Sequence, residues 1–214
     1  MQVKYSNFRL DDKIYNTNEL SGIYDEDGTF LDSTIYDIRT LIYNKNMPVM
    51  WFLKLGSQKE RKKFIPEFLD EFEISKELQK RKLGTLSESE LLKVLIIKVC
   101  VSEARVVILD SIDSVLNWKD LNTVLKKMRS HAKASGQNIL FTTNKLDNMV
   151  NHSDKYIIVK DNKITYNNKD FSAMPELTET GKFAEMANKR GADLHKYKDP
   201  SDLLKAIYRD VKRR

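Results

Sequence analysis

The sequence predicts an α/β protein with a mostly parallel sheet flanked by helices. In the second half of the chain, short β-branched runs alternate with longer segments of helical periodicity. One of those runs, "RVVILD", ends at Asp110, as a buried parallel strand that presents an acid would. With 214 residues, of which 41% are hydrophobic and 32% charged, the chain can bury one sizeable core.

The first half of the chain predicts a less regular order of elements. "ELSGIY" and "PVMWFLKL" have the composition of strands, and "STIYDIRTLIYN" has the periodicity of a helix. The charged segment "SQKERKKFIPEFLDEFEISKELQKRK" follows, and Pro66 within it is typical of a helix start.

The second half predicts a regular alternation of helices and strands. Helices are expected at 87–102, 118–135 and 145–151, and strands at 105–110, 138–143, 155–160 and near "KITY". Ligands of such sheets bind beyond the carboxyl ends of the strands. We therefore expect a site near Asp110 and Thr143, which both fall at that edge.

The pattern changes near residue 167. We expect an α/β domain over 1–166, with a reduced helical subdomain at about 57–86, and a C-terminal helical extension over 167–214. The last predicted helix, "PSDLLKAIYRDVKRR", has an apolar stripe formed by Leu203, Leu204, Ile207 and Val211. Such a stripe usually covers its own core, and the alternative is docking in the groove of a partner.

Composition excludes several classes of protein. A single cysteine, Cys100, excludes a disulfide framework and favours a reducing, cytoplasmic setting. It lies in the most apolar run, "LLKVLIIKVCV", which contains two lysines and is shorter than the roughly 20 residues that span a bilayer. The N-terminus has no hydrophobic signal core. The net charge of +6 permits contact with nucleic acid or an anionic membrane but does not require it.

The order of motifs resembles an ATP-binding cassette (ABC) ATPase domain over residues 67–165. "LSESELLKVLIIKVCVSEARVVILDSIDSVLN" is similar to a Leu-Ser-Gly-Gly-Gln signature that opens a helix, an apolar strand ending in Asp-Glu and a Ser-Ala-Leu-Asp turn. "NILFTTNKLDNMVNHSDKYIIVKDNKIT" is similar to the strand that ends in the switch histidine, the next helix and the closing hairpin. The resemblance implies a P-loop NTPase-like fold, with ATP and Mg²⁺ as cofactors.

The segment "DEDGTFLDST" lies where the family has its phosphate-binding loop. That loop, G-x-x-x-x-G-K-[ST], uses glycines, a lysine and a hydroxyl to hold phosphate and Mg²⁺. The nucleotide-binding candidates that remain here are Gly28, Thr29, Ser33 and Thr34. The lysine is missing, and four carboxylates stand nearby, at Asp25, Glu26, Asp27 and Asp32. One such charge about 6 Å from a phosphate costs about 3 kcal/mol at an effective dielectric of 20. The alternative is an acidic turn before a capped helix.

The signature segment has also changed. Ser87 remains as a nucleotide-binding candidate, but Glu88 and Glu90 bring carboxylates to the helix N-terminus that would grip a phosphate. Ser87 and Glu90 fit S-x-x-E, a capping box. The sequence therefore predicts that the helix start is kept for folding while the anion site is lost.

Residues at the expected catalytic positions also lack the reactive groups that the family has there. By the resemblance, Asp110 matches the Mg²⁺-organising aspartate, and Gln58 is a weaker match to the metal-contacting glutamine. Ser111 stands at the position of the catalytic glutamate, and a serine is not a general base at neutral pH. Asn144 stands at the switch-histidine position and cannot take a proton. Asn117 replaces the aspartate of the dimer-contact turn.

These departures predict a catalytically degenerate ABC-type subunit with weak or no ATP hydrolysis. We expect a cytoplasmic accessory or regulatory protein whose partner is an active ABC subunit or a membrane protein, in a transporter-like assembly. Binding of ATP and Mg²⁺, and dimerisation, are left open. One alternative is a DNA-associated protein that resembles an ATPase head. The other is a purely structural interaction protein on the same fold.

Overall fold

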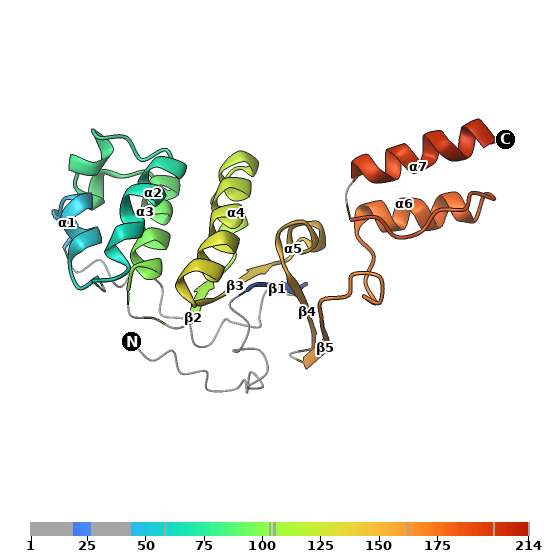
Figure 1. Ribbon diagram of the computed structural model, residues 1–214, viewed down its shortest axis with the longest axis horizontal. Helices are drawn as coiled ribbons and strands as arrows, with labels where there is room; N and C mark the ends of the chain where they lie inside the picture. Colours follow the sequence, from blue (N-terminus) through green and yellow to red (C-terminus); the bar gives the residue numbers. More distant parts are fainter. Residues whose placement is uncertain are drawn as a thin grey trace.

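The computed structural model describes residues 19–26, 44–57, 59–102, 104, 106–161, 163–198 and 200–213, with the side chains of 210–213 left out. Within these residues the chain forms a five-stranded sheet of order β2-β3-β1-β4-β5 (Figure 1). The strands are β1 (Leu20–Asp25), β2 (Val106–Leu109), β3 (Asn138–Thr143), β4 (Lys155–Lys160) and β5 (Lys163–Asn168). Parallel pairing joins β2 to β3, β3 to β1 and β1 to β4, whereas β5 runs antiparallel to β4. The predicted mostly parallel α/β fold is confirmed.

Close packing fixes β1 in the middle of the sheet. A Cβ atom added at Gly22 would lie 2.1 Å from Ser153 Oγ and 2.6 Å from Met149 Cγ. Only glycine therefore allows α5 (Leu146–His152) to approach the strand so closely. The helix expected from "STIYDIRTLIYN", which follows β1 in the sequence, lies outside the described residues except for Asn44.

Helices α4 (Trp118–Ser135) and α5 lie on the same face of the sheet (Figure 1). The buried side of α4 contains Leu121, Val124 and Leu125, which join buried residues of β2 and β3 in the main hydrophobic cluster. α4 ends at Gly136, whose φ of +70° gives the left-handed C-cap that favours glycine. The predicted helix at 118–135 is confirmed.

A group of helices lies beyond the β2 edge of the sheet. It contains α1 (Val49–Lys54), α2 (Ile65–Glu71) and α3 (Glu88–Cys100), linked by the 3-10 turns η3 (Lys62–Phe64), η4 (Leu78–Lys80) and η5 (Leu83–Thr85) (Figure 1). A fourth 3-10 turn, η6 (Ile112–Ser114), follows β2. Pro66 lies in the first turn of α2, where it was expected.

The prediction of a strand at "PVMWFLKL" is wrong, because these residues form α1. Val49, Phe52 and Leu53 are buried together, which is the i, i+3, i+4 spacing of one helical face. Trp51 is exposed between them. Burial of that face has overridden the β propensity of Val, Trp and Phe.

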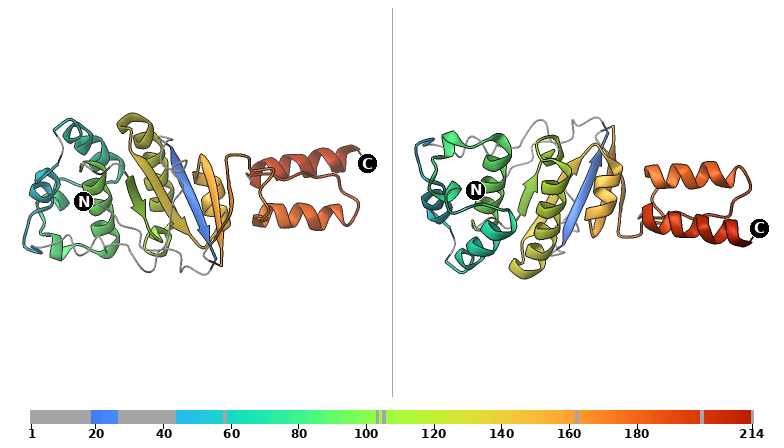
Figure 2. Two further views of the ribbon diagram at one scale, coloured as in Figure 1. Left: turned by 90° about the horizontal axis from the view of Figure 1, so that it is seen from below. Right: turned by 90° about the horizontal axis from the view of Figure 1, so that it is seen from above.

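The C-terminal segment forms a pair of helices, α6 (Glu179–Asn188) and α7 (Pro200–Arg213), side by side and away from the sheet (Figure 2). Ala184 of α6 packs in one cluster with Leu203 and Ile207 of α7. Leu204 is 52% exposed, so the stripe predicted on α7 packs against α6 only in part. No helix among the described residues is long and apolar enough to span a bilayer.

Candidate functional site

A cavity of about 270 Å³ lies at the carboxyl ends of β1, β2 and β3. It is lined by Asp25, Asp110, Ser111, Asp113, Ser114, Thr142, Thr143, Asn144 and Lys145. The structure thus brings Asn144 together with Asp110 and Ser111, which are far from it in the sequence, and all three were singled out from the sequence. The other sequence candidates, Gly28, Thr29, Ser33, Thr34 and Gln58, lie outside the described residues.

Three side chains at this edge form a closed set of hydrogen bonds. Asp110 Oδ1 accepts hydrogen bonds from Thr142 Oγ1 and, at 3.2 Å, from Ser111 Oγ. The backbone N–H of Ser111 donates to Thr142 Oγ1 at 3.0 Å. A ligand that needs the Asp110 carboxylate must therefore compete with bonds that the protein already makes.

Ser111 adopts a left-handed backbone conformation, with φ of +47° and ψ of +35°. This region is uncommon for residues other than glycine, asparagine and aspartate. The conformation turns the chain sharply at the end of β2, and the Ser111 side chain stays exposed at the cavity. The hydroxyl meets no described histidine there that could act as its base, so nothing at this site supports a serine nucleophile.

Asp113 is a site residue that sequence reasoning missed. Its Oδ2 accepts hydrogen bonds from Thr143 Oγ1 at 2.6 Å and from Asn148 Nδ2 at 2.8 Å. Both donors belong to buried residues, on β3 and α5 respectively. The carboxylate thereby ties the η6 turn to two other elements, and only its place three residues after Asp110 hinted at this from the sequence.

The described lining of the cavity carries more negative than positive charge. Asp25, Asp110 and Asp113 contribute three carboxyl groups to the lining, against the single ammonium group of Lys145. Like charges at a few ångströms repel even at a moderate effective dielectric. Among the described residues, no group of three or more His, Cys, Asp and Glu side chains could hold a metal ion. Of the sequence candidates for nucleotide and Mg²⁺, Asp110 lines this cavity, whereas the segment that would hold the phosphates and Gln58 lie outside the described residues.

The side chain of Ser87 caps the helix that it begins, α3. Its Oγ accepts a hydrogen bond from the N–H of Glu90 at 3.2 Å, and Glu90 Oε2 accepts one from the N–H of Ser87 at 2.8 Å. This is the predicted capping box at the start of α3, and it is confirmed. Asn117 has the same role for α4, because its Oδ1 accepts from the N–H of Asp120 at 2.9 Å.

Comparison with known proteins shows the fold. No protein-family model and no curated protein matches the sequence. Among solved structures, an ATP-binding subunit of an ABC transporter is 16% identical with a TM-score of 0.55, over 89% of this chain and 88% of that one. The protein cbiO1 from Clostridium perfringens, part of the ABC transporter complex cbiONQ, is 15% identical with a TM-score of 0.53, over 71% and 77%. A complex of the archaeal ribosomal stalk protein aP1 and the archaeal ribosome recycling factor aABCE1 gives 13% identity and a TM-score of 0.55.

These similarities establish that the chain has the fold of an ABC ATPase nucleotide-binding domain. The chain spans less than two thirds of several neighbours, with 56% of a putative metal-chelate type ABC transporter, 39% of the structure with the recycling factor and 32% of the RNase-L Inhibitor. The same fold can carry different functions, so function has to be argued from the site.

Proposed function

We propose that this chain is a catalytically degenerate ABC-type subunit that acts as an accessory or regulatory partner in a transporter-like assembly. The observation that carries the proposal is Ser111, which directly follows Asp110 at the end of β2. By the resemblance, the general base of the hydrolytic reaction belongs at that position. A serine hydroxyl does not accept a proton at neutral pH, and a positioned general base is typically worth about 10²- to 10⁴-fold in rate.

The surroundings of Ser111 support the same proposal. Asn144 lines the cavity just after β3, the strand next to β2, and its amide can hydrogen-bond but cannot take a proton. Asp110 is already engaged by Thr142 and by Ser111 itself. At the position that follows Asp110, the cavity therefore has no carboxylate or imidazole to activate a water, and its three carboxyl groups disfavour the triphosphate.

The parts of the family pattern that remain are those that fold the protein. The capping box at Ser87 and the mostly parallel sheet are present, and Asn117 caps α4 although it replaces the family's aspartate. A subunit that keeps this framework without the reactive groups would act by position and shape. An active ABC subunit or a membrane protein is the proposed partner.

The test is Mg-ATP binding to the full chain by calorimetry, with ATP hydrolysis measured for the unmodified chain and for Ser111→Glu. Ser111→Ala is the matched control, because it removes the hydroxyl without adding a carboxylate. We expect no turnover by the unmodified chain or by Ser111→Ala, and binding no tighter than about 1 mM, or about −4 kcal/mol. Turnover by the unmodified chain would overturn the proposal. Micromolar binding without turnover would keep the catalytic degeneracy and make this an ATP-holding subunit.

A further inference from the structure

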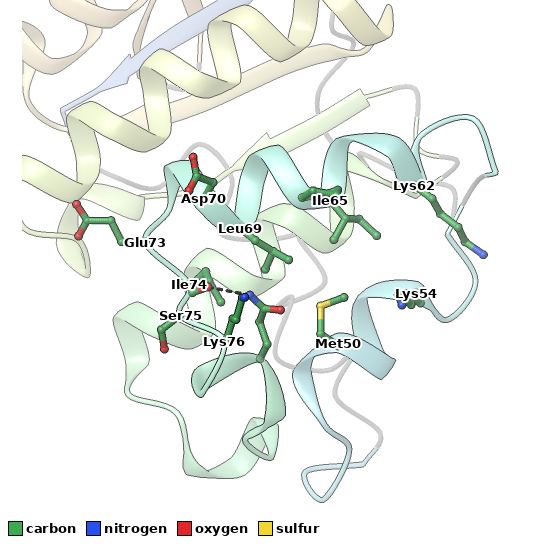
Figure 3. A pocket seen from close by; sticks show the side chains of 12 residues that line it. Met50, Lys54, Lys62, Ile65, Leu69, Asp70, Glu73, Ile74, Ser75 and Lys76 are labelled. Carbon is green, nitrogen blue, oxygen red and sulfur yellow. Dashed lines mark hydrogen bonds between the residues drawn. The ribbon is translucent and has the colours of Figure 1, made fainter.

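A large open groove lies between α1, α2 and residues 73–79, well away from the strand ends (Figure 3). Its volume is about 850 Å³, and its apolar lining is Met50, Ile65, Pro66, Leu69 and Ile74. A second hollow of about 670 Å³ adjoins it and shares Met50, Lys54, Lys76 and Gln79 with it. We call the two together the α1–α2 groove.

The outer face of α1 has no described partner. The helix buries Val49, Phe52 and Leu53 against the core, which leaves Trp51 60% exposed along the second hollow. Leu55, just after the helix, is 50% exposed. Exposed tryptophan beside a hollow is typical of residues that anchor protein interfaces.

The charged rim of the groove is mostly positive. Lys54, Lys62, Lys76 and Lys80 line it, and none of them makes an ion pair with another described residue. Two carboxylates, Asp70 and Glu73, lie toward its other end (Figure 3). Glu73 is already paired with Lys119 at 2.9 Å, which leaves Asp70 to oppose the lysines.

The lysines of the neighbouring helices behave differently. Lys93 of α3 pairs with Asp120 at 2.6 Å, and Lys127 of α4 pairs with Glu67 and Glu71. Acidic side chains thus pair with lysines between the helices, whereas the groove lysines make no ion pair with Asp70 or with any other described residue. The described lining has four lysines against Asp70 and the already paired Glu73, so a partner with negative charge would complement it.

We infer that the α1–α2 groove binds an amphipathic helix of a partner protein, with Asp or Glu residues beside its apolar stripe. The two adjoining hollows with apolar lining can take side chains at i, i+3, i+4 and i+7 of a helix, and the lysine rim complements flanking carboxylates. The inference deepens the proposed accessory role, on which it rests for the presence of a protein partner. The α1–α2 groove shares no residue with the cavity at the strand ends.

The protein carries its own reporter for this interaction. The chain has two tryptophans, so Trp118→Phe leaves Trp51 as the only one. The full chain with this change would be used to select from a display library of helical peptides of about 16 residues. The apolar stripe of the peptides is fixed as leucine, and their polar positions vary among Glu, Lys, Gln and Ser. We expect enrichment of Glu, a blue shift of Trp51 emission on binding, and dissociation constants of about 10–100 μM.

Charge reversal then locates the site. Lys54→Glu combined with Lys76→Glu should weaken binding of the selected peptides at least tenfold. Lys163→Glu is the control, because that exposed lysine lies on β5 at the opposite edge of the sheet and has no ion pair with a described residue. It should leave the dissociation constant unchanged, and circular dichroism would verify that each variant is folded.

The inference fails if no peptide is enriched, if enrichment has no acidic preference, or if both sets of variants behave alike. Duplex DNA that quenches Trp51 and displaces the peptides would also overturn it, with nucleic acid as the occupant of the groove. ATP turnover measured on the same preparation separates the two proposals. ATP turnover together with peptide binding would overturn the proposed catalytic degeneracy and support the groove as a binding site. No turnover and no peptide binding would support the degeneracy and overturn the inference about the groove.

Discussion

The cavity at the strand ends and the α1–α2 groove use polar side chains in opposite ways. At the strand ends, Asp110 and Asp113 each accept two hydrogen bonds from neighbouring side chains. Around the groove, Lys54 and Lys76 find no partner among the described residues. The two carboxylates of the first region are hydrogen-bonded within the protein, whereas the lysines of the second could pair with another molecule.

This difference predicts whether a substitution in each region changes the stability of the protein or its binding to a partner. Hydrogen bonds to a charged group contribute about 1.5–3 kcal/mol, so changes at the strand ends should mainly affect folding. Exposed groups without partners contribute little to stability, so changes at the groove should mainly affect association. If both proposals hold, the cavity at the strand ends acts as a structural element and the partner binds at the groove.

The largest effect should come from a matched pair of glycines. Gly22→Ala should lower the free energy of unfolding by about 3 kcal/mol, because the new Cβ would meet Ser153 and Met149 inside the core. Gly56, just after α1, has φ of +59°, and a Cβ added there would meet nothing within 4 Å, so Gly56→Ala should cost only about 1 kcal/mol for the backbone. Urea unfolding of both variants checks this. Equal losses would mean that the two regions are packed alike.

The next effect is at Asp113. Asp113→Ala should lower the free energy of unfolding by about 2–3 kcal/mol, because the Thr143 hydroxyl and the Asn148 amide would be left buried without their acceptor. Asp113→Asn keeps one oxygen acceptor and should cost less. Thermal and urea unfolding of the two variants give the comparison, and a loss below about 0.5 kcal/mol for Asp113→Ala would contradict the role assigned to this carboxylate.

Lysines provide the third comparison. Lys127 is 4% exposed and pairs with Glu67 and Glu71, so Lys127→Ala should lower the free energy of unfolding by about 2 kcal/mol. This value is reduced from that of a fully buried pair because both glutamates are partly exposed. Lys54→Ala should stay within about 0.5 kcal/mol of the unmodified chain. A similar loss in both variants, measured by urea unfolding, would mean that the groove lysines have structural partners after all.

The sequence predicted those parts of the molecule that depend on local patterns. Asp110 could be placed at the end of a strand, and Ser87 at a helix cap, from residues within a few positions of each. α1 was missed because its conformation depends on burial of one face against distant residues. Asp113 was missed because its partners are 30 and 35 residues away in the sequence. The lysines of the groove were visible as a charged segment, but their lack of partners requires the fold.

The smallest predicted effect is a loss of stability as the pH is lowered, and it allows the two regions to be compared directly. The ring of buried His131 packs edge-on against Phe64 and Phe68 of the α2 region, at centroid distances of 5.0 Å and 4.9 Å, and its Nε2 lies 2.8 Å from Gln137 Oε1. Burial lowers the pKa of His131 below its ordinary value of 6.5, and the hydrogen bond with Gln137 offsets part of that effect. Burial, followed by the charge of Arg129, lowers the pKa of His152 in the same direction.

The sign of the pH dependence follows from these two shifts. The unfolded chain binds protons more readily than the folded one, so the full stabilisation is present above pH 6.5 and is lost as the pH falls from there toward the folded-state pKa values. Urea unfolding at pH 7.5 and 5.5 should show the loss, and His152→Gln should remove part of it. His131 lies under α2, which forms one wall of the groove. Protection factors from hydrogen exchange, which correct for the slower intrinsic exchange at low pH, should therefore fall more in residues 65–71 than in residues 111–117 between pH 7.5 and pH 5.5. Equal decreases in protection would mean that the strand ends and the groove open as one unit, and that the difference between the two regions does not extend to their dynamics.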